Sequence, residues 1–302
     1  MPAVAIITDS AACVPEELIG KYEIEVAPMV LIYQGKAYRD KIDISSAEFY
    51  ESLSHDEILW TTSAPSPGSY LELFRKVADR VSHILVITTT KKLTHAFESA
   101  KVSVDIAREE LSSLTIEVLD SGTAAGAQGL VVLAAARAAN RGETLSRVID
   151  STRSMMSKVS LIAFLDTLYY LAKGGRVPQV AAWASSLLRI KPIVEVMPLS
   201  GGVRSLQRVR TRLSAIKRLK EMVKERVNKK SVHCIVMHSN VIDEAAELKE
   251  HMSCELDCAE IYITDFTPVM GLHTGPGLLG VAFYTENEND MGDYYEENKY
   301  NR

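Results

Sequence analysis

The sequence predicts an α/β protein with two domains, the first built on a mostly parallel sheet and the second of α+β character. In the first half, β-rich segments alternate with segments of helical periodicity, an order typical of a parallel sheet covered by helices on both faces. Near residue 150 the alternation changes to neighbouring strands that include a hairpin signal. The chain has 302 residues, 47% of them hydrophobic, so it can build a substantial core.

Periodicity and capping residues define the elements of the first half. Apolar residues at 70, 73, 74, 77 and 81 have the spacing of an amphipathic helix, and Ser66 suits its N-cap. The segment from Gly129 is almost wholly apolar, which favours a buried helix. The expected order is strand 4–10, helix 14–22, β-rich segment 24–33, helices 46–53 and 66–81, strand 83–90, helix 93–111, strand 115–121 and helix 129–139.

The second half has a different rhythm. Ser200-Gly201-Gly202 between two β-rich arms indicates a hairpin, and Gly174-Gly175 closes a short helix. The expected order is strand 160–166, helix 167–175, apolar helix 180–188, hairpin 191–210, basic helix 211–227, strand 232–239, helix 243–252 and strands 260–266 and 278–284. We therefore expect domains at residues 1–152 and 153–285, followed by an acidic mobile tail at residues 286–302.

Charge and hydropathy exclude several classes of protein. The net charge of −5 argues against a nucleic-acid-binding protein, which normally presents a basic face. The first residues lack the cationic start of a secretory signal. The most apolar window, from Gly129, is shorter than the roughly 17–25 residues that cross a bilayer. We expect a cytoplasmic protein.

Neither a metal site nor a cofactor site is expected. His251, Cys254 and Cys258 lie near one another, but the second pair of short spacing that zinc sites usually have is missing. Buried thiols on an amphipathic helix are the favoured interpretation. The chain lacks a Walker-type loop, a G-x-G-x-x-G fingerprint after the first strand, a G-x-S-x-G elbow and an H-E-x-x-H motif. The glycines of "GTAAGAQG" have the wrong spacing for dinucleotides and indicate close helix packing instead.

Hydroxyl groups crowd the segment "WTTSAPSPGSYLELF", residues 60–74. Ser66 and Pro67 suit the N-cap and first position of a helix, which leaves Thr62 and Ser63 unexplained. Free N–H groups at a helix start attract anions, so the turn fits either ordinary capping or a carboxylate or phosphate site.

Two more polar turns have similar chemistry. One follows strand 83–90 and supplies Thr88, Thr89, Thr90 and Thr94 with His95 beside them, and the other is "DSAACVP" after the first strand. Ligands of open α/β sheets bind beyond the carboxyl ends of the strands. We therefore expect the three turns at one sheet edge. His273 and Thr274 precede a turn with Gly275, Pro276 and Gly277, where an imidazole can serve an anionic ligand or be structural.

These segments together resemble the DegV family of bacterial lipid-binding proteins. The matching pieces are "ITDSAACVP", "TTSAPSPGSY", "LTHAFESA", "YLAKGGRV", "LLRIKPIVEV", "VRTRLSAI" and "HTGPGLLGVAF", in the order of the family, across residues 5–284. The resemblance implies a two-domain α/β fold with a long-chain fatty acid buried between the domains. It also implies the carrier subunit of a fatty-acid kinase, which presents the carboxylate to a separate ATP-dependent kinase and then holds the acyl phosphate for membrane lipid synthesis.

The resemblance also implies roles for individual residues. Thr62 and Ser63 are expected to bind the carboxylate, Thr94 takes the place of a family serine, and His273 and Thr274 complete the head-group site. A second implied set contacts the kinase partner or phosphate: Arg176, and with it Arg204, Arg208 and Arg210. Phe164, Leu165 and Trp183 are candidates for the acyl-chain pocket, although core packing explains each of them equally well. A transient contact with a membrane or an acyltransferase also belongs to this role.

The sequence departs from the family pattern near the head group. His95 stands where the family has glycine, and Thr90-Lys91 replaces a serine pair. An added imidazole and ammonium either strengthen anion binding or narrow the site. The alternative to a carrier is a hydrolase or transferase acting on a small anionic or acylated substrate, with His273 as general acid or base. The absence of a nucleophile or metal set that can be named weighs against it.

Overall fold

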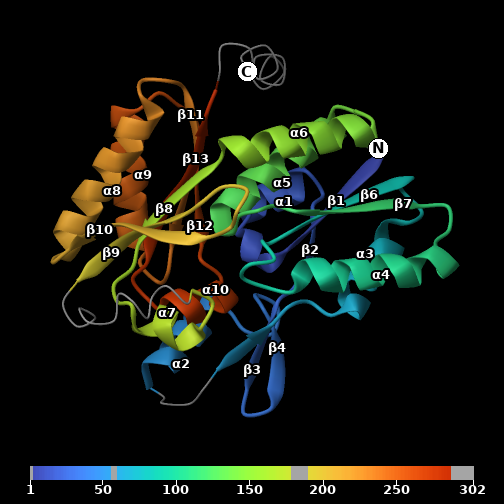
Figure 1. Ribbon diagram of the computed structural model, residues 1–302, viewed down its shortest axis with the longest axis horizontal. Coiled ribbons are helices and arrows are strands. Elements are labelled where there is room, and N and C mark those ends of the chain that lie inside the picture. Colours follow the sequence, from blue (N-terminus) through green and yellow to red (C-terminus); the bar gives the residue numbers. More distant parts are fainter. Residues whose placement is uncertain (1–2, 56–59, 178–189, 287–302) are drawn as a thin grey trace.

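The computed structural model describes residues 3–55, 60–177 and 190–286 (Figure 1). The apolar helix expected at 180–188, with Trp183, and the acidic tail after Glu286 lie outside these residues. Within the described ranges, no helix is long and apolar enough to cross a membrane. The fold contains a four-stranded, a six-stranded and a three-stranded sheet, and the expected two-domain α/β fold is confirmed.

A parallel sheet forms the core of the first half. Its strands, in spatial order, are β2 (Glu25–Ala27), β1 (Val4–Asp9), β6 (His83–Thr88) and β7 (Thr115–Asp120). One face packs against α3 (Pro67–Val77) and α4 (Ala96–Glu110). The strands are apolar on both faces because the opposite face is covered too, by α5 (Ala125–Asn140) with α6 (Leu145–Lys158).

A mixed sheet forms the core of the second half. Its spatial order is β10 (Val203–Val209), β9 (Lys191–Val196), β8 (Ser160–Phe164), β13 (Leu279–Thr285), β11 (Val232–His238) and β12 (Cys258–Asp265). Only the β11–β12 pair is parallel. The outer face packs against α8 (Arg212–Val227) and α9 (Ile242–Glu255).

Helix α5 lies between the two large sheets and joins their cores. It is buried along almost its whole length. Because protein covers it on almost all sides, its sequence is almost wholly apolar and does not have the polar face of a surface helix. Gly126 and Gly129 permit this close packing, because a Cβ atom there would lie 2.8 Å from Met237 Sδ and 2.8 Å from the Ala12 carbonyl oxygen, respectively. The glycines of "GTAAGAQG" therefore serve helix packing, as expected.

A small antiparallel sheet lies beside both halves. It consists of β4 (Lys36–Arg39), β3 (Val30–Tyr33) and β5 (Thr61–Ser63). An apolar cluster joins it to α2 (Ser46–His55) from the first half and α10 (Pro268–Thr274) from the second. Helix α7 (Tyr169–Gly174) packs against α10. In Figure 1 this layer lies at the bottom of the molecule.

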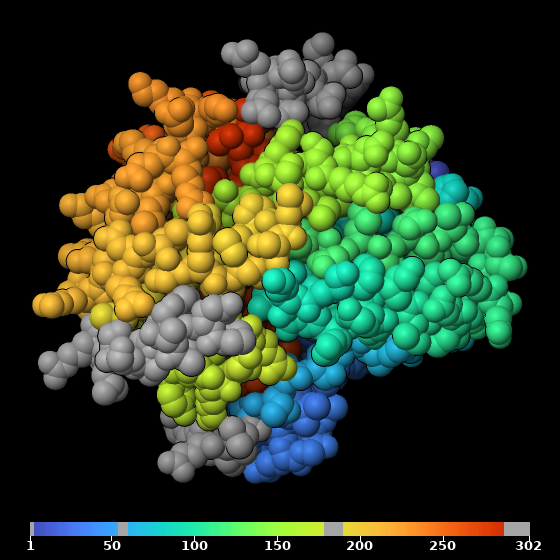
Figure 2. All heavy atoms as spheres, in the orientation of Figure 1, coloured from blue at the N-terminus to red at the C-terminus, as the bar shows by residue number. Residues whose placement is uncertain are grey.

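The β9–β10 hairpin reaches from the second half onto the first. Gly201 in its turn has φ +62°, and a Cβ atom there would lie 2.1 Å from Thr90 Oγ1, so only glycine fits without a shift. The backbone of Leu199 also lies close to Gly122, where a Cβ atom would be 2.7 Å from the Leu199 carbonyl oxygen. Figure 2 shows the surface of the hairpin meeting that of the α4 region.

Several sequence expectations need correction. Thr61–Ser63 is a strand of the small sheet, not a turn. The segment around it still lies beside the turns after β1 and β6, because Ser99 of α4 donates to the Pro65 carbonyl and Trp60 shares an apolar cluster with Ala11 and Ala96. Cys254 is exposed on α9 and Cys258 begins β12, so the two are not buried thiols of one helix. The boundary proposed after residue 152 falls within α6 and stays a proposal. The sequence did not indicate β4, α6, α10 or the short helix η1 (Ser10–Ala12), whereas the helix expected at 14–22 is found as α1 (Glu16–Lys21).

Candidate functional site

Thr62 is placed by the register of the small sheet. It pairs with Leu31 of β3, and its side chain is half-buried, whereas its strand neighbours Thr61 and Ser63 are exposed. Alternation of side chains along the strand turns the Thr62 hydroxyl toward the second half of the chain. Ser66 caps α3 by accepting the Ser69 N–H at 3.1 Å, as the sequence predicted.

Three segments that are distant in sequence meet at the Thr62 hydroxyl. His273, in the last turn of α10, brings its Nε2 to 3.0 Å from Thr62 Oγ1. Arg176, which follows α7, has its Nη2 3.5 Å from the same oxygen and donates through Nη1 to the Gly174 carbonyl at 2.8 Å. Gly174 also lies against the imidazole, since a Cβ atom there would be 2.5 Å from His273 Nδ1. We call Thr62, His273 and Arg176 the head-group cluster.

The hydrogen bonds within the head-group cluster indicate which donor is available to bind an anion. His273 Nδ1 is buried and has no hydrogen-bond partner in the part of the chain that the structure describes. A buried N–H without an acceptor is more costly than an unmet lone pair. We therefore infer the neutral tautomer in which Nε2–H donates to Thr62 Oγ1. Arg176 is a second donor to that oxygen. The Thr62 O–H is then free to donate to a ligand oxygen outside the cluster.

His273 is held in its neutral form. Burial and, to a smaller extent, the positive charge of Arg176 together lower the pKa of its imidazole to about 4. Because the folded-state pKa is below the ordinary value of 6.5, the stability contributed by neutral His273 is present above pH 6.5 and is lost as the pH falls through about 4. At neutral pH the site thus has one cation, Arg176, and neutral donors.

An NMR titration of the lipid-free protein measures this state directly. We expect the His273 ring signals, assigned through a His273→Gln variant, to keep their neutral-form shifts down to about pH 4. Addition of a carboxylate ligand is expected to raise this pKa, because a nearby negative charge stabilises the imidazolium. A midpoint near 6.5 in the lipid-free protein would contradict the burial of the ring.

The other expected head-group residues make no hydrogen bond to the cluster within the described residues. The exposed Ser63 has its hydroxyl 3.2 Å from the Ala64 carbonyl, and Thr274 donates to the Met270 carbonyl within its own helix. Thr94 is half-buried before α4. The side chain of His95 is 92% exposed, with Nδ1 3.9 Å from Glu98. The structure therefore joins Thr62, His273 and Arg176 and leaves the ligand contacts of the rest as predictions.

The acyl-pocket candidates face different cores. Phe164 is fully buried in the cluster beneath α8 and α9, where its ring lies 5.1 Å from the Arg212 guanidinium. Leu165 is buried in the cluster around α5, between the two large sheets. Of the two, Leu165 therefore lies on the side where the halves of the chain meet.

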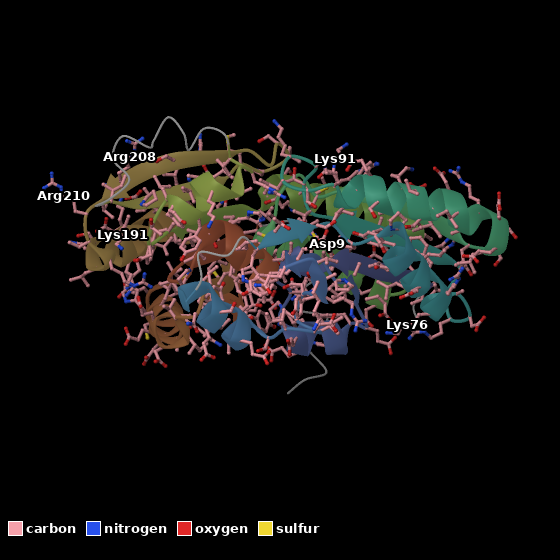
Figure 3. All side chains as sticks on the ribbon, turned by 90° about the horizontal axis from the view of Figure 1, so that it is seen from below. Asp9, Lys76, Lys91, Lys191, Arg208 and Arg210 are labelled. Carbon is pink, nitrogen blue, oxygen red and sulfur yellow. The ribbon has the colours of Figure 1, made fainter. Side chains whose placement is uncertain are left out.

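Three arginines expected at a partner surface lie on β10 or directly after it. Arg204 is paired at 2.6 Å with Glu195, a carboxylate that also pairs with Arg226. Arg208 and Arg210 are exposed and make no ion pair with a described residue. Figure 3 shows both at the end of the molecule that also carries Lys191, distant from Asp9. A contact of these arginines with a partner stays a prediction.

A buried polar network, not foreseen as such, lies at the carboxyl edge of the parallel sheet. Asp9, fully buried, accepts the Thr89 N–H at 2.7 Å, and its other oxygen is 2.6 Å from Thr89 Oγ1. Thr89 Oγ1 is 2.7 Å from Gln128 Oε1, Gln128 Nε2 is 3.1 Å from Thr8 Oγ1, and Thr8 donates to the Ile87 carbonyl at 2.8 Å. The only signal in the sequence was a polar turn after each of two strands.

No group of three or more histidine, cysteine, aspartate or glutamate side chains in the described ranges is arranged to hold a metal ion.

Comparison with known proteins identifies the family. The model of a family described as "Uncharacterised protein, DegV family" matches residues 3–286. The chain belongs to the DegV family. A DegV domain-containing protein of Clostridium perfringens is 32% identical over 94% of this chain and 100% of its own length. Protein DegV of Bacillus subtilis is 28% identical over 93% of this chain and 98% of its own.

Solved structures of DegV proteins share the fold. DegV of Bacillus subtilis, described as a fatty acid binding protein, has a TM-score of 0.83 and 27% identity, covering 95% of this chain and 100% of its own. A fatty acid binding DegV family protein of Streptococcus agalactiae has a TM-score of 0.81 and 25% identity, with the same coverage. A DegV family protein of Thermus thermophilus, at 24% identity and a TM-score of 0.84, shows the same fold over 95% of this chain and 100% of its own.

Proposed function

We propose that this DegV protein binds a long-chain fatty acid, with the carboxylate at the head-group cluster and the acyl chain in the apolar interior. The observation that carries the proposal is that two nitrogen donors approach the hydroxyl oxygen of Thr62. His273 Nε2 lies 3.0 Å from this oxygen and Arg176 Nη2 lies 3.5 Å from it. This arrangement offers an oriented O–H and one cation to an anion. The likeness to the fatty acid binding DegV proteins of Bacillus subtilis and Streptococcus agalactiae supports it.

The chemistry of the chain suits an amphipathic anion. Burial of about sixteen methylene groups contributes roughly 0.8 kcal/mol each. The summed free energy is larger than the free-energy cost of ordering the ligand and the protein on binding. Apolar clusters adjoin the head-group cluster, since α10 belongs to the cluster of the small sheet and Met270 also packs on the core around α5. A fatty acid therefore finds donors for its carboxylate and apolar side chains close by.

The finer role that we propose is presentation of the fatty acid to a kinase. Thr62 holds a carboxylate through a neutral hydroxyl, which leaves the second carboxylate oxygen open to a phosphate donor. The exposed Arg176 beside it can then contact either the new phosphate or the partner kinase. In this role the protein works in the cytoplasm, where ATP is available, and passes an acyl phosphate to phospholipid synthesis.

The enzyme alternative rests on the same His273–Thr62 contact. A histidine 3.0 Å from a hydroxyl is the geometry of a nucleophile with its general base. Among the described residues the third group of such a triad is missing, because none of them forms a hydrogen bond with His273 Nδ1. Hydrolysis of acyl esters by the isolated chain, lost in His273→Ala, would support the enzyme over the carrier.

A comparison of matched ligands tests the proposed function. Lipid-free protein is titrated with a C16 or C18 fatty acid and with the fatty alcohol of the same chain length. We expect the acid to bind at least about tenfold more tightly, since it alone offers a charged acceptor to the donors of the cluster. Equal affinities would show apolar burial without a carboxylate site, and binding of neither would overturn the proposal.

A further inference from the structure

Asp40 is a buried carboxylate that the proposed ligand site does not use. It follows β4 directly and is 1% exposed. One carboxylate oxygen accepts the Ser10 hydroxyl at 2.6 Å, and the other accepts the N–H of Val269 at 3.2 Å. Its carboxylate thus joins the end of β1 and the small sheet to a helix more than 200 residues later in the chain.

The backbone around Asp40 is fixed as well. The Asp40 N–H donates to the Met29 carbonyl at 2.9 Å, and the Met29 N–H donates to Ser10 Oγ at 3.1 Å. Ser10, Met29 and Asp40 therefore form a closed set of hydrogen bonds within the first half. A carboxylate held in this way has a defined position from which it can hold a second element.

The element that Asp40 holds is the one that carries His273. Val269 and His273 both lie on α10, four residues apart, which is about one turn of helix. Val269 bonds to Asp40 after β4, and His273 bonds to Thr62 in β5, so α10 is attached at two points to strands of the same small sheet. The first attachment sets the axial position of the helix, and this position decides whether the second can form.

A third contact near α10 acts on the preceding loop instead. The Tyr50 hydroxyl donates to the Phe266 carbonyl at 3.0 Å, two residues before the helix begins. Gly271 then passes close to the same hydroxyl, where a Cβ atom would lie 2.1 Å away. Tyr50 thus supports the segment from one side, while Asp40 is the described side chain that accepts a hydrogen bond from the helix backbone itself.

We propose that Asp40 is a positioning residue for the head-group cluster: it holds α10 on the small sheet so that His273 meets Thr62. Its role in ligand binding rests on the proposed function, but its effect on His273 exists without a ligand. Asp40 acts through the helix and does not contact the ligand.

The test has one part without ligand and one with it. In lipid-free Asp40→Ala we expect the His273 ring signals to move away from their native positions, and we expect the same in Thr62→Val, which removes the hydroxyl that His273 contacts. The control is Asp43→Ala, three residues on, whose exposed carboxylate pairs with Arg39 and does not contact α10. It is expected to leave the His273 signals in place. Unchanged His273 signals in folded Asp40→Ala would overturn the proposal.

A double-mutant cycle with fatty acid separates positioning from a general loss of stability. In the native background, Thr62→Val is expected to weaken binding about tenfold or more; in the Asp40→Ala background the same change is expected to cost less than about threefold. An equal cost in both backgrounds would show that Asp40 does not position the Thr62–His273 pair. If the native chain binds no fatty acid, the proposed function fails while the ligand-free NMR result still decides the role of Asp40.

A milder variant keeps the proposal testable if Asp40→Ala does not fold. Ser10→Ala removes one hydroxyl and leaves Asp40 bonded to Val269 without its Ser10 donor. We expect the same His273 signals to move in the same direction by a smaller amount. Native His273 signals in Ser10→Ala together with an unfolded Asp40→Ala would contradict positioning and indicate a purely structural carboxylate.

Discussion

Thr62→Val will lower the affinity for a long-chain fatty acid by roughly 10- to 100-fold. Valine has nearly the shape of threonine, so β5 and the small sheet keep their packing. The change removes the hydroxyl that we propose as donor to the carboxylate, and a hydrogen bond to a charged group contributes about 1.5–3 kcal/mol. It also removes the oxygen on which His273 Nε2 and Arg176 Nη2 converge. Isothermal titration calorimetry with delipidated protein measures the effect.

Thr61→Val is the matched control for this prediction. Thr61 is the neighbouring residue of β5, bears the same hydroxyl and is exposed. The hydroxyls of adjacent strand residues point to opposite faces, so Thr61→Val is expected to leave the affinity within about twofold. If the two variants bound fatty acid equally well, Thr62 would have no role at the carboxylate.

Asp9→Asn will stabilise the protein at pH 8, by about 2 kcal/mol. Four hydrogen bonds form a linear chain of side chains that starts at Asp9 and ends at the Ile87 carbonyl. In order, they join Asp9 to Thr89, Thr89 to Gln128, Gln128 to Thr8, and Thr8 to Ile87. The two threonine hydroxyls and the glutamine amide supply only three hydrogens, so we infer that a protonated Asp9 supplies the fourth. The amide of asparagine brings that hydrogen at every pH and keeps an oxygen for the Thr89 N–H.

The pH dependence distinguishes this explanation from a general gain in packing. Burial raises the pKa of Asp9 from 3.8 to about 6. The stability contributed by the protonated form is fully present below pH 3.8 and is lost as the pH rises through about 6, a total of about 3 kcal/mol for the full shift. Urea unfolding should therefore show the gain of Asp9→Asn at pH 8 and almost none at pH 4.

Asp120→Asn provides the control for Asp9→Asn. Asp120 ends the neighbouring strand β7, but its side chain is 23% exposed and accepts the Gly122 N–H at 2.9 Å. It is not part of the chain of four hydrogen bonds that starts at Asp9, so no gain that grows with pH is expected. A gain of Asp9→Asn that is equal at pH 4 and pH 8 would contradict a protonated Asp9.

Most of the fold could be predicted from local patterns, and its exceptions have physical reasons. Helices α3, α5 and α8 and strands β6, β11 and β13 have clear periodicity or long apolar runs. The three residues of β5 have no such run, and the prolines that follow make the segment look like a turn. Helix α10 has only seven residues and contains Gly271, too little for a periodic signal.

The candidate site was predictable residue by residue but not as an assembly. Thr62, His273 and Arg176 were expected from the family resemblance, one motif at a time. Their meeting depends on contacts between residues 211 and 114 positions apart, which no local pattern contains. The same holds for Asp40, whose partner Val269 is 229 positions away. Asp9 looked like part of an open ligand edge because the sequence does not reveal that Thr89 and Gln128 enclose it.

Mass spectrometry of the protein's bound lipid tests the central claim most directly. The full chain is produced in a bacterial host and measured by native mass spectrometry, then its organic extract is analysed. We predict one long-chain fatty acid per chain, greatly reduced in Thr62→Val and retained in Thr61→Val. A native chain that carries no fatty acid and takes up none when it is added would contradict the account.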